Sequence, residues 1–230
     1  MNKRLMIFIP ASRDWMEEKF MFEFLRLIDP PGWTKGVINL RGHCASDRHN
    51  EAFNSLPRLE AMWETRFDRI FFMDSDQYYP GDFLVKMVAH EEPVVAAWSV
   101  SRYPPYEIAQ YNNAGDKIVD GVTFPDYQTI NQNDFPDDTF ECDAVGLGAA
   151  MFDRDLIDKI DPVWFTDLNA YDGTRLLCDD FHFFSKLNKS GYRVTVDKRI
   201  PIGHYSNALV LPSNRHLLKE AAEIAKEYTG

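Results

Sequence analysis

The sequence is poor in cysteine and has no long hydrophobic run. Its 230 residues contain three cysteines, an odd number without Cys-x-x-Cys spacing: Cys44, Cys142 and Cys178. This set excludes a small disulfide scaffold, and we expect buried thiols in a reducing compartment. No stretch approaches the ~18 apolar residues of a transmembrane helix. The first apolar run, residues 5–9, ends at Pro10 and is too short for a signal peptide, so we expect a soluble, cytoplasmic protein.

Positive charge is also in short supply. The chain has 25 Lys and Arg against 36 Asp and Glu, a net charge of −11, which opposes non-specific binding to nucleic acid or anionic membrane. Residues 1–60 hold nine basic and eight acidic side chains, so the N-terminal part can hold an anion that the remainder repels. With 45% apolar residues, the chain can fill a large core, and intrinsic disorder is excluded.

Apolar runs of strand length alternate with segments of helical periodicity through residue 98. The expected strands are residues 5–9, 37–40, 69–73 and 94–98, and the expected helices are 14–28, one capped by Ser46 that runs to Trp63, and one that starts at Pro80-Gly81. Short crossovers of this βαβ kind predict an α/β protein with a mainly parallel, doubly wound sheet.

The pattern changes beyond residue 98. We expect an antiparallel hairpin of strands 106–111 and 117–124 around a turn at Asn112-Asn113-Ala114-Gly115, and then a loop at 125–139. Strand character resumes at 140–152, and the expected elements after it are helices 153–160 and 179–190 and a strand at 192–196. Residues 213–228 have the pattern of an amphipathic helix. We therefore expect one domain at 1–206 and, within 207–230, a C-terminal helix packed on it.

Two carboxylates stand at the end of one expected strand. The apolar run to Met73 is followed by Asp74-Ser75-Asp76, and on an extended backbone residues i and i+2 point to the same side. Asp74 and Asp76 can therefore converge on a hard divalent cation, at the carboxyl edge where open parallel sheets bind ligands. The structural alternative is that Asp74 caps a turn and Asp76 is solvated.

Further polar residues follow other expected strands or open helices, so they should face the same edge. They are the segment Arg48-His49-Asn50, the glycines Gly146 and Gly148, the pair Asp179 and Asp180, and His204 after Gly203. In this order, and with Pro10 after the first strand, the set resembles the glycosyltransferases of the GT-A fold, especially small family 2-like bacterial and phage members. The resemblance covers roughly residues 5–206 and implies a GT-A fold.

The resemblance implies a hexosyltransferase-type enzyme that uses a nucleotide-sugar, with uracil or guanine as the base. It assigns Mn²⁺ or Mg²⁺ to Asp74, Asp76 and His204, where the cation would neutralise charge on the leaving nucleoside diphosphate. The residues that it assigns to the donor are Pro10, Ala11, Arg13, Arg48, Asn50, Asp74, Ser75, Gly146 and Gly148. Each of the two arginines is equally explained as a surface cation, His204 as a structural histidine, and the glycines as part of a bent strand.

The resemblance also implies a base for the acceptor hydroxyl. Asp179-Asp180 stands where these enzymes usually have Glu-Asp, and in inverting members the second carboxylate takes the proton, so Asp180 is the expected base and Asp179 its partner. Both residues could instead be helix caps. Retention of configuration stays open, because spacing in the sequence does not fix the face of attack.

Other functions remain open from the sequence. A nucleotidyltransferase of similar fold would usually carry a Gly-rich loop after the first strand, and Pro10-Ala11-Ser12-Arg13 has no glycine. A catalytically inactive domain that binds sugar or nucleotide is the second alternative. The acceptor is open among a glycan, a small molecule and a modified phage DNA base, and so is the oligomeric state. Candidates for the acceptor wall are Trp98, Arg102, Tyr103 and Trp164.

Overall fold

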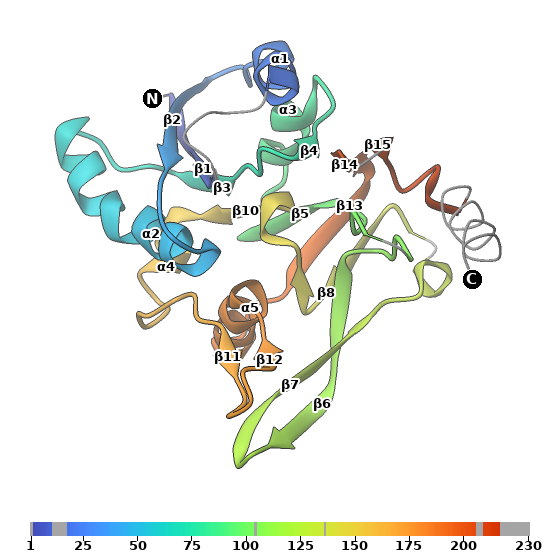
Figure 1. Cartoon of the computed structure of the whole chain (residues 1–230). Coiled ribbons are helices and arrows are strands. Elements are labelled where there is room, and N and C mark those ends of the chain that lie inside the picture. Colours follow the sequence, from blue (N-terminus) through green and yellow to red (C-terminus); the bar gives the residue numbers. More distant parts are fainter. Residues whose placement is uncertain (1, 11–17, 104, 136, 206–208, 217–230) are drawn as a thin grey trace.

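The computed structural model describes residues 2–10, 18–103, 105–135, 137–205 and 209–216. It is a mixed α/β fold around a seven-stranded sheet in the order β2-β1-β3-β10-β5-β13-β8 (Figure 1). The strands of this sheet are β1 (Lys3–Pro10), β2 (Trp33–Leu40), β3 (Arg69–Phe72), β5 (Val94–Trp98), β8 (Thr139–Cys142), β10 (Ala150–Asp153) and β13 (Val194–Pro201). Five run in one direction, whereas β10 and β8 run against their neighbours, so the expected mainly parallel sheet is found in this form.

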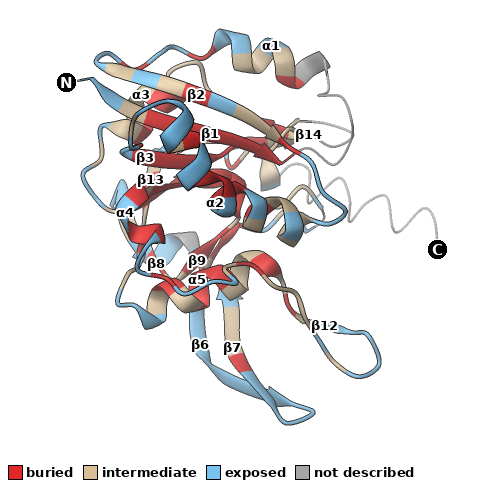
Figure 2. Ribbon diagram, turned by 90° about the vertical axis from the view of Figure 1, so that its left-hand side faces the viewer, coloured by how far each residue is buried: buried red, intermediate tan, exposed pale blue. Residues whose placement is uncertain are grey.

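Helices cover both faces of the sheet. They are α1 (Glu18–Arg26), α2 (Ala45–Met62), α3 (Phe83–Val88), α4 (Arg154–Ile157) and α5 (Asp179–Lys189). Side chains alternate along β1, so that Met6 and Phe8 join the core under α2 and α5, whereas Leu5 and Ile7 join the core under α1 and α3. All four are fully buried, and Figure 2 shows the central strands as the most buried part of the molecule. Each such side chain contributes about 1.5–3 kcal/mol to folding.

Smaller sheets flank the main one. One consists of β4 (Gln77–Tyr78), β14 (Gly203–Tyr205) and β15 (Leu209–Val210), and another of β6 (Gln110–Val119), β7 (Val122–Thr129) and β9 (Ala144–Val145). The strands β11 (Leu168–Asn169) and β12 (Arg175–Leu177) form a hairpin, and the 3-10 turns are η1 (Gln132–Asp134) and η2 (Leu147–Ala149). The β6–β7 hairpin extends away from the main sheet beside β11 and β12 (Figure 1).

The position predicted for the turn of that hairpin is wrong. The Asn112–Gly115 segment lies inside β6, where the register shifts between Asn113 and Asp116, and the chain reverses at Asp120-Gly121. Both turn residues have positive φ, 51° and 78°, as the favoured two-residue hairpin turn requires. The Asn-rich segment is therefore a bulge rather than a turn, and β7 extends into the first five residues, 125–129, of the expected loop at 125–139.

Other boundaries differ more modestly. β2 starts at Trp33, four residues before the expected strand, and α2 starts after Cys44, so Ser46 is not its N-cap. The expected strand at 140–152 is divided among β8, β9, η2 and β10. Residues 217–230 lie outside the described residues, so the C-terminal helix and the two-part division of the chain stay predictions. Among the described residues, no helix is long and apolar enough to cross a membrane.

Asn50 joins the start of α2 to the segment before β11. Its Nδ2 donates to the carbonyls of Ser46, at 2.8 Å, and Phe165, at 2.7 Å. Its Oδ1 accepts from the backbone N–H groups of Trp164, at 3.1 Å, and Phe165, at 3.2 Å. The amide group therefore satisfies backbone groups 114 and 115 residues away in the sequence, and it fixes the α2 turn that carries residues 48 and 49.

We expect Asn50→Ala to lower the free energy of unfolding by about 1–3 kcal/mol, because it leaves half-buried backbone groups without partners. Asn54→Ala is the matched control, since Asn54 is exposed one turn further along α2. The control should change stability by less than ~0.5 kcal/mol. Urea unfolding of the two variants measures the difference, and equal stabilities would show that the Asn50 bonds contribute nothing.

Candidate functional site

A cleft of about 500 Å³ opens at the carboxyl ends of β1 and β3. Its walls come from the start of α2, the segment after β3 and the start of α5. The lining residues are Pro10, Ala45, Arg48, His49, Asp74, Ser75, Asp76, Arg102, Asp179 and Asp180. The fold therefore brings both acidic pairs to one cavity, at the sheet edge where ligands of open α/β folds bind.

Backbone contacts fix the turn that carries Asp74. Met73 N–H donates to the carbonyl of Phe8 at 2.8 Å, which extends the β1–β3 ladder by one residue. Asp74 N–H then donates to the Tyr79 hydroxyl at 2.9 Å, and this buried tyrosine donates in turn to Gln77 Oε1 at 2.7 Å. Gly148 lies against the Asp74 side chain, where a Cβ would be only 2.6 Å from Asp74 Cγ. A glycine is therefore needed for the close approach of η2 to Asp74.

The two carboxylates of this turn have different electrostatic surroundings. Burial, followed by repulsion from Asp76, raises the pKa of Asp74 to about 7. Asp76 instead forms an ion pair with Arg102 across the mouth of the cleft. Arg102, which the sequence offers as a candidate for the acceptor wall, therefore partners the Asp-x-Asp motif.

His204 lies next to this turn, because β14 pairs with β4 and Tyr205 N–H donates to the Asp76 carbonyl at 2.8 Å. Its Nδ1 is 2.6 Å from the Val100 carbonyl, and its Nε2 is 2.9 Å from Gln77 Nε2. The carbonyl can only accept, so Nδ1 carries the proton and Nε2 accepts from the amide. Burial lowers the pKa of His204, opposed by Asp76. The neutral ring is thus held with both nitrogens occupied.

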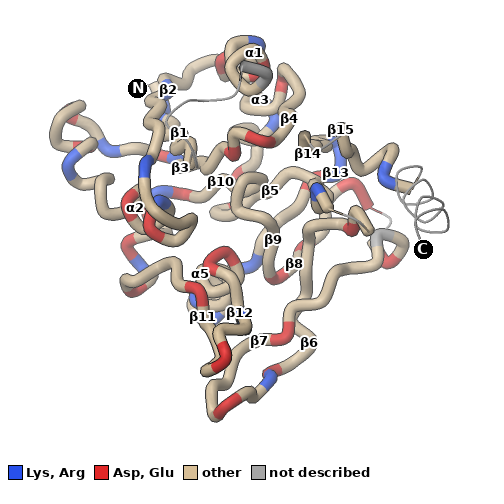
Figure 3. The backbone as a smooth tube through the Cα atoms, in the orientation of Figure 1, with Lys and Arg blue, Asp and Glu red and all other residues tan. Residues whose placement is uncertain are grey.

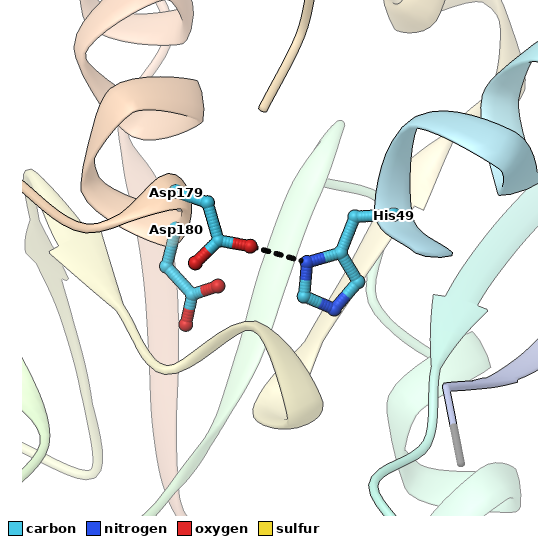
Figure 4. A group of neighbouring side chains, drawn as sticks. All are labelled: His49, Asp179 and Asp180. Atoms are coloured by element: carbon cyan, nitrogen blue, oxygen red, sulfur yellow. Dashed lines mark hydrogen bonds and ion pairs between the residues drawn. The ribbon is translucent and has the colours of Figure 1, made fainter. Parts of the chain in front are cut away.

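The second acidic pair opens α5. Asp179 Oδ2 lies 2.9 Å from His49 Nδ1 (Figure 4), and Asp180 Oδ2 accepts from Leu147 N–H at 3.2 Å. Burial and then the charge of Asp179 raise the pKa of Asp180, His49 opposes both, and the resulting pKa is about 6. For Asp179, burial favours a raised pKa, but the hydrogen bond from His49, its charge and backbone N–H groups together outweigh burial, and the pKa is lowered.

His49 is the buried histidine between the two acidic pairs. Its ring packs edge-on against Phe72, with centroids 5.2 Å apart, and tilted against Phe165 at 5.1 Å. Burial disfavours its charge, but the hydrogen bond to Asp179 and the charge of Asp180 outweigh burial, so the pKa of His49 is raised. One nitrogen of His49 and one oxygen from each aspartate of that pair lie within 4.8 Å of one another. The ring therefore lies where a positive charge is favoured by the neighbouring carboxylates.

The remaining donor-site candidates fall in different places. Pro10, Arg48 and Ser75 line the cleft, and Gly146 precedes η2, whereas Ala11 and Arg13 lie outside the described residues. Asn50 lies behind the cleft wall, and its amide contacts backbone groups. Arg48 Nη1 donates to the Gly42 carbonyl at 3.1 Å, but its buried Nε makes no hydrogen bond in the described part of the chain.

The sequence analysis assigned no role to His49 or Tyr79, and it did not predict Arg102 as the partner of Asp76. His49 lies between two candidates, Arg48 and Asn50. Residues i, i+3 and i+4 of a helix share one face, and the cleft-lining residues Ala45, Arg48 and His49 have this spacing. That periodicity could have separated the cleft-facing residues from Asn50. The contact between His49 and Asp179 spans 130 residues, and no local pattern predicts it.

Comparisons with known proteins relate this chain to solved structures at low sequence identity. No family model and no curated protein matches it. The structure of A197 from STIV is similar with a TM-score of 0.56 and 16% identity over 90% of this chain and 93% of that one. This likeness shows a shared fold.

Two weaker likenesses have a TM-score of 0.43. S. aureus TarS 1–349 in complex with UDP-GlcNAc is 14% identical over 84% of this chain and 55% of that chain. The structure of 4-diphosphocytidyl-2C-methyl-D-erythritol synthase is 10% identical over 95% of this chain and 98% of that chain.

We expect Asp74→Asn to stabilise the metal-free protein at pH 8, raising Tm by about 2–4 °C, the shift that ~1 kcal/mol produces in a chain of this size. The pKa of Asp74 is raised from 3.8 to about 7 on folding, so its ionisation opposes folding above pH 7. The penalty decreases as the pH falls towards 4, because the folded state then binds the proton. Thermal unfolding at pH 8 and pH 4 tests this, with the exposed Asp116→Asn as the control. A destabilised variant at pH 8 would contradict it.

Proposed function

We propose that this protein is a metal-dependent glycosyltransferase of the GT-A type, which transfers a sugar from a nucleotide-sugar to an acceptor hydroxyl. The observation that carries the proposal is the meeting of two acidic pairs in one cleft. Asp74 and Asp76 come from the end of β3, and Asp179 and Asp180 come from the start of α5. One pair is suited to a cation and the other to a proton, which are the two requirements of this chemistry.

The first pair fits a divalent cation. Asp74 is crowded by Asp76 and has a raised pKa, and both effects are relieved by a positive ion. The cation would be Mn²⁺ or Mg²⁺, held by Asp74 and Asp76, and when bound it supplies charge neutralisation for a leaving diphosphate. His204 can join these ligands if Nε2 gives up its contact with Gln77.

The second pair suits an acid–base role. In an inverting reaction Asp180 would take the proton of the acceptor hydroxyl, and its pKa of about 6 keeps it ionised at neutral pH while leaving it basic enough to accept a proton. Leu147 N–H holds one oxygen of this carboxylate, and Asp179 is bonded to His49 instead. Asp180 is therefore the stronger candidate of the two for the base.

The donor would carry UDP or GDP, and the compartment proposed is the cytoplasm. Arg48 in the cleft wall, with an unpaired buried Nε, suits the diphosphate. In the view of Figure 3, basic and acidic residues of the described chain are interspersed. Together with the net charge of −11, this distribution argues against non-specific nucleic-acid binding.

Nucleotide binding is the first test of the proposal. We expect UDP or GDP to raise Tm in the presence of Mn²⁺ and to have no effect in excess EDTA, because the diphosphate would otherwise face Asp74 and Asp76 unscreened. Asp76→Ala should abolish the metal-dependent shift. Equal stabilisation in EDTA would contradict the metal assignment, and stabilisation by neither nucleotide would contradict the function.

Catalysis is tested on the donor alone, since slow hydrolysis of a nucleotide-sugar needs no acceptor. We expect Asp180→Asn to bind the nucleoside diphosphate normally and to lower donor turnover by ~10²–10⁴-fold, because an amide cannot accept the proton. Asp116→Asn, on exposed β6, is the control. Wild-type turnover in Asp180→Asn would exclude it as the base, and release of pyrophosphate from a nucleoside triphosphate would indicate a nucleotidyltransferase.

A further inference from the structure

His49 is fixed on several sides, and one of its ring nitrogens is left for a ligand. Asp179 holds Nδ1 at 2.9 Å, and the rings of Phe72 and Phe165 pack against the imidazole. The residue is only 6% exposed, yet it lines the cleft. Within the described part of the chain Nε2 makes no hydrogen bond, and in Figure 4 it lies on the ring edge away from Asp179. This nitrogen is therefore available to a ligand in the cleft.

The surroundings decide which partner this nitrogen can take. Asp179 accepts from Nδ1, while Asp180 and Asp74 contribute negative charge near the ring. These groups favour the imidazolium form, in which both nitrogens carry protons and neither can accept. In this form the ligand atom that meets Nε2 is an acceptor, and a negatively charged oxygen makes the strongest bond.

The wall that carries His49 is itself suited to anions. α2 begins there, and the side chain of its N-cap residue Cys44 does not cap the helix. The first turn therefore presents free N–H groups and the positive end of the helix dipole. Arg48, the neighbouring residue, adds a guanidinium with a buried unpaired Nε. Asp47, the acidic residue of that turn, is exposed and lines a different cavity on the outer side of the helix.

We propose that His49 is a phosphate-binding residue, whose Nε2–H donates to a phosphate oxygen of the nucleoside diphosphate in the cleft. The inference rests on the proposed function. It assigns one wall of the cleft to the phosphates of the nucleoside diphosphate and the other wall to the cation. The α2 wall, with His49 and Arg48, holds the phosphate oxygens, and the carboxylates of Asp74 and Asp76 hold the cation. Asp179 acts through His49 as a positioning residue, because it fixes the ring.

Two substitutions distinguish the roles of the two ring nitrogens of His49. In His49→Asn the amide nitrogen can take the place of Nδ1 and keep the bond to Asp179, but nothing replaces Nε2. In His49→Gln the amide nitrogen can take the place of Nε2 instead. His182→Asn is the control, since His182 lies on α5 with Nδ1 3.0 Å from the Trp164 carbonyl and does not line the cleft.

The experiment is calorimetric titration with UDP, GDP and inorganic pyrophosphate in the presence of Mn²⁺, with uridine as the phosphate-free probe. We expect His49→Asn to weaken UDP or GDP and pyrophosphate by about 10–100-fold, as loss of a charged hydrogen bond does, and to leave uridine binding unchanged. His49→Gln should lose less affinity, and His182→Asn should bind like the wild type. Thermal unfolding of each variant verifies that it is folded.

A measurement on the wild-type protein covers the case in which a variant does not fold. The ¹⁵N resonances of the His49 ring should shift on addition of pyrophosphate and Mn²⁺, and those of His182 should not. Wild-type affinity in His49→Asn, or an unmoved His49 resonance, would overturn the role of His49. Binding of pyrophosphate but of neither nucleotide would overturn the proposed function and leave the role of His49 standing, and binding of no probe would overturn both.

Discussion

Electrostatic repulsion among four carboxylates is the constraint on which the cleft depends. Asp74 and Asp76 on one side and Asp179 and Asp180 on the other line the same cavity, where Asp179 is buried and the other three are partly buried. The two pairs are balanced in the same way. Asp76 is paired with Arg102 and Asp179 with His49, so each pair has one carboxylate that is neutralised and one that is not. The unpaired members are the ones with raised pKa values, about 7 for Asp74 and about 6 for Asp180. Such carboxylates favour the arrival of a cation or a proton.

The fold maintains this crowded arrangement through contacts that are distant in sequence. β10 inserts between β3 and β5 and so brings η2, just before it, against the Asp-x-Asp turn. The Tyr79 hydroxyl accepts a hydrogen bond from Asp74 N–H and also lies 3.0 Å from the Gly148 carbonyl. On the other side, Asn50 ties the start of α2 to residues 164 and 165 and thereby fixes the turn that carries His49. Burial of these hydrogen-bonded groups holds charges together that would separate in water.

The sequence predicts the parts of this arrangement that depend on local patterns. The buried run of β1, the start of α5 at Asp179 and the strand that ends before Asp74 all follow from hydrophobic periodicity and turn residues. The predicted position of the hairpin turn is wrong because Asn112–Gly115 and Asp120-Gly121 are both good turn sequences. The pairing of β6 with β7 and β9 decides between them. The position of β10 and the contact of His49 with Asp179 depend on pairing across long stretches of chain. The sequence analysis therefore finds the acidic residues of the cleft and misses the cations that balance them.

The balance of charges also explains why two carboxylate pairs can serve different ends in the proposed reaction. Asp74 is turned into protein, against Gly148, and its neighbour Asp76 lies at the cleft mouth with an exchangeable partner in Arg102. A divalent cation held by these two carboxylates would compete with Arg102 for Asp76 and would relieve the repulsion that helps to raise the pKa of Asp74. Asp180 has no such exchange available, because His49 is committed to Asp179 and Leu147 N–H supplies only one hydrogen bond. In the proposed reaction, its raised pKa would therefore serve the proton of an acceptor hydroxyl. The same repulsion between carboxylates would then favour a cation on one side of the cleft and a proton on the other.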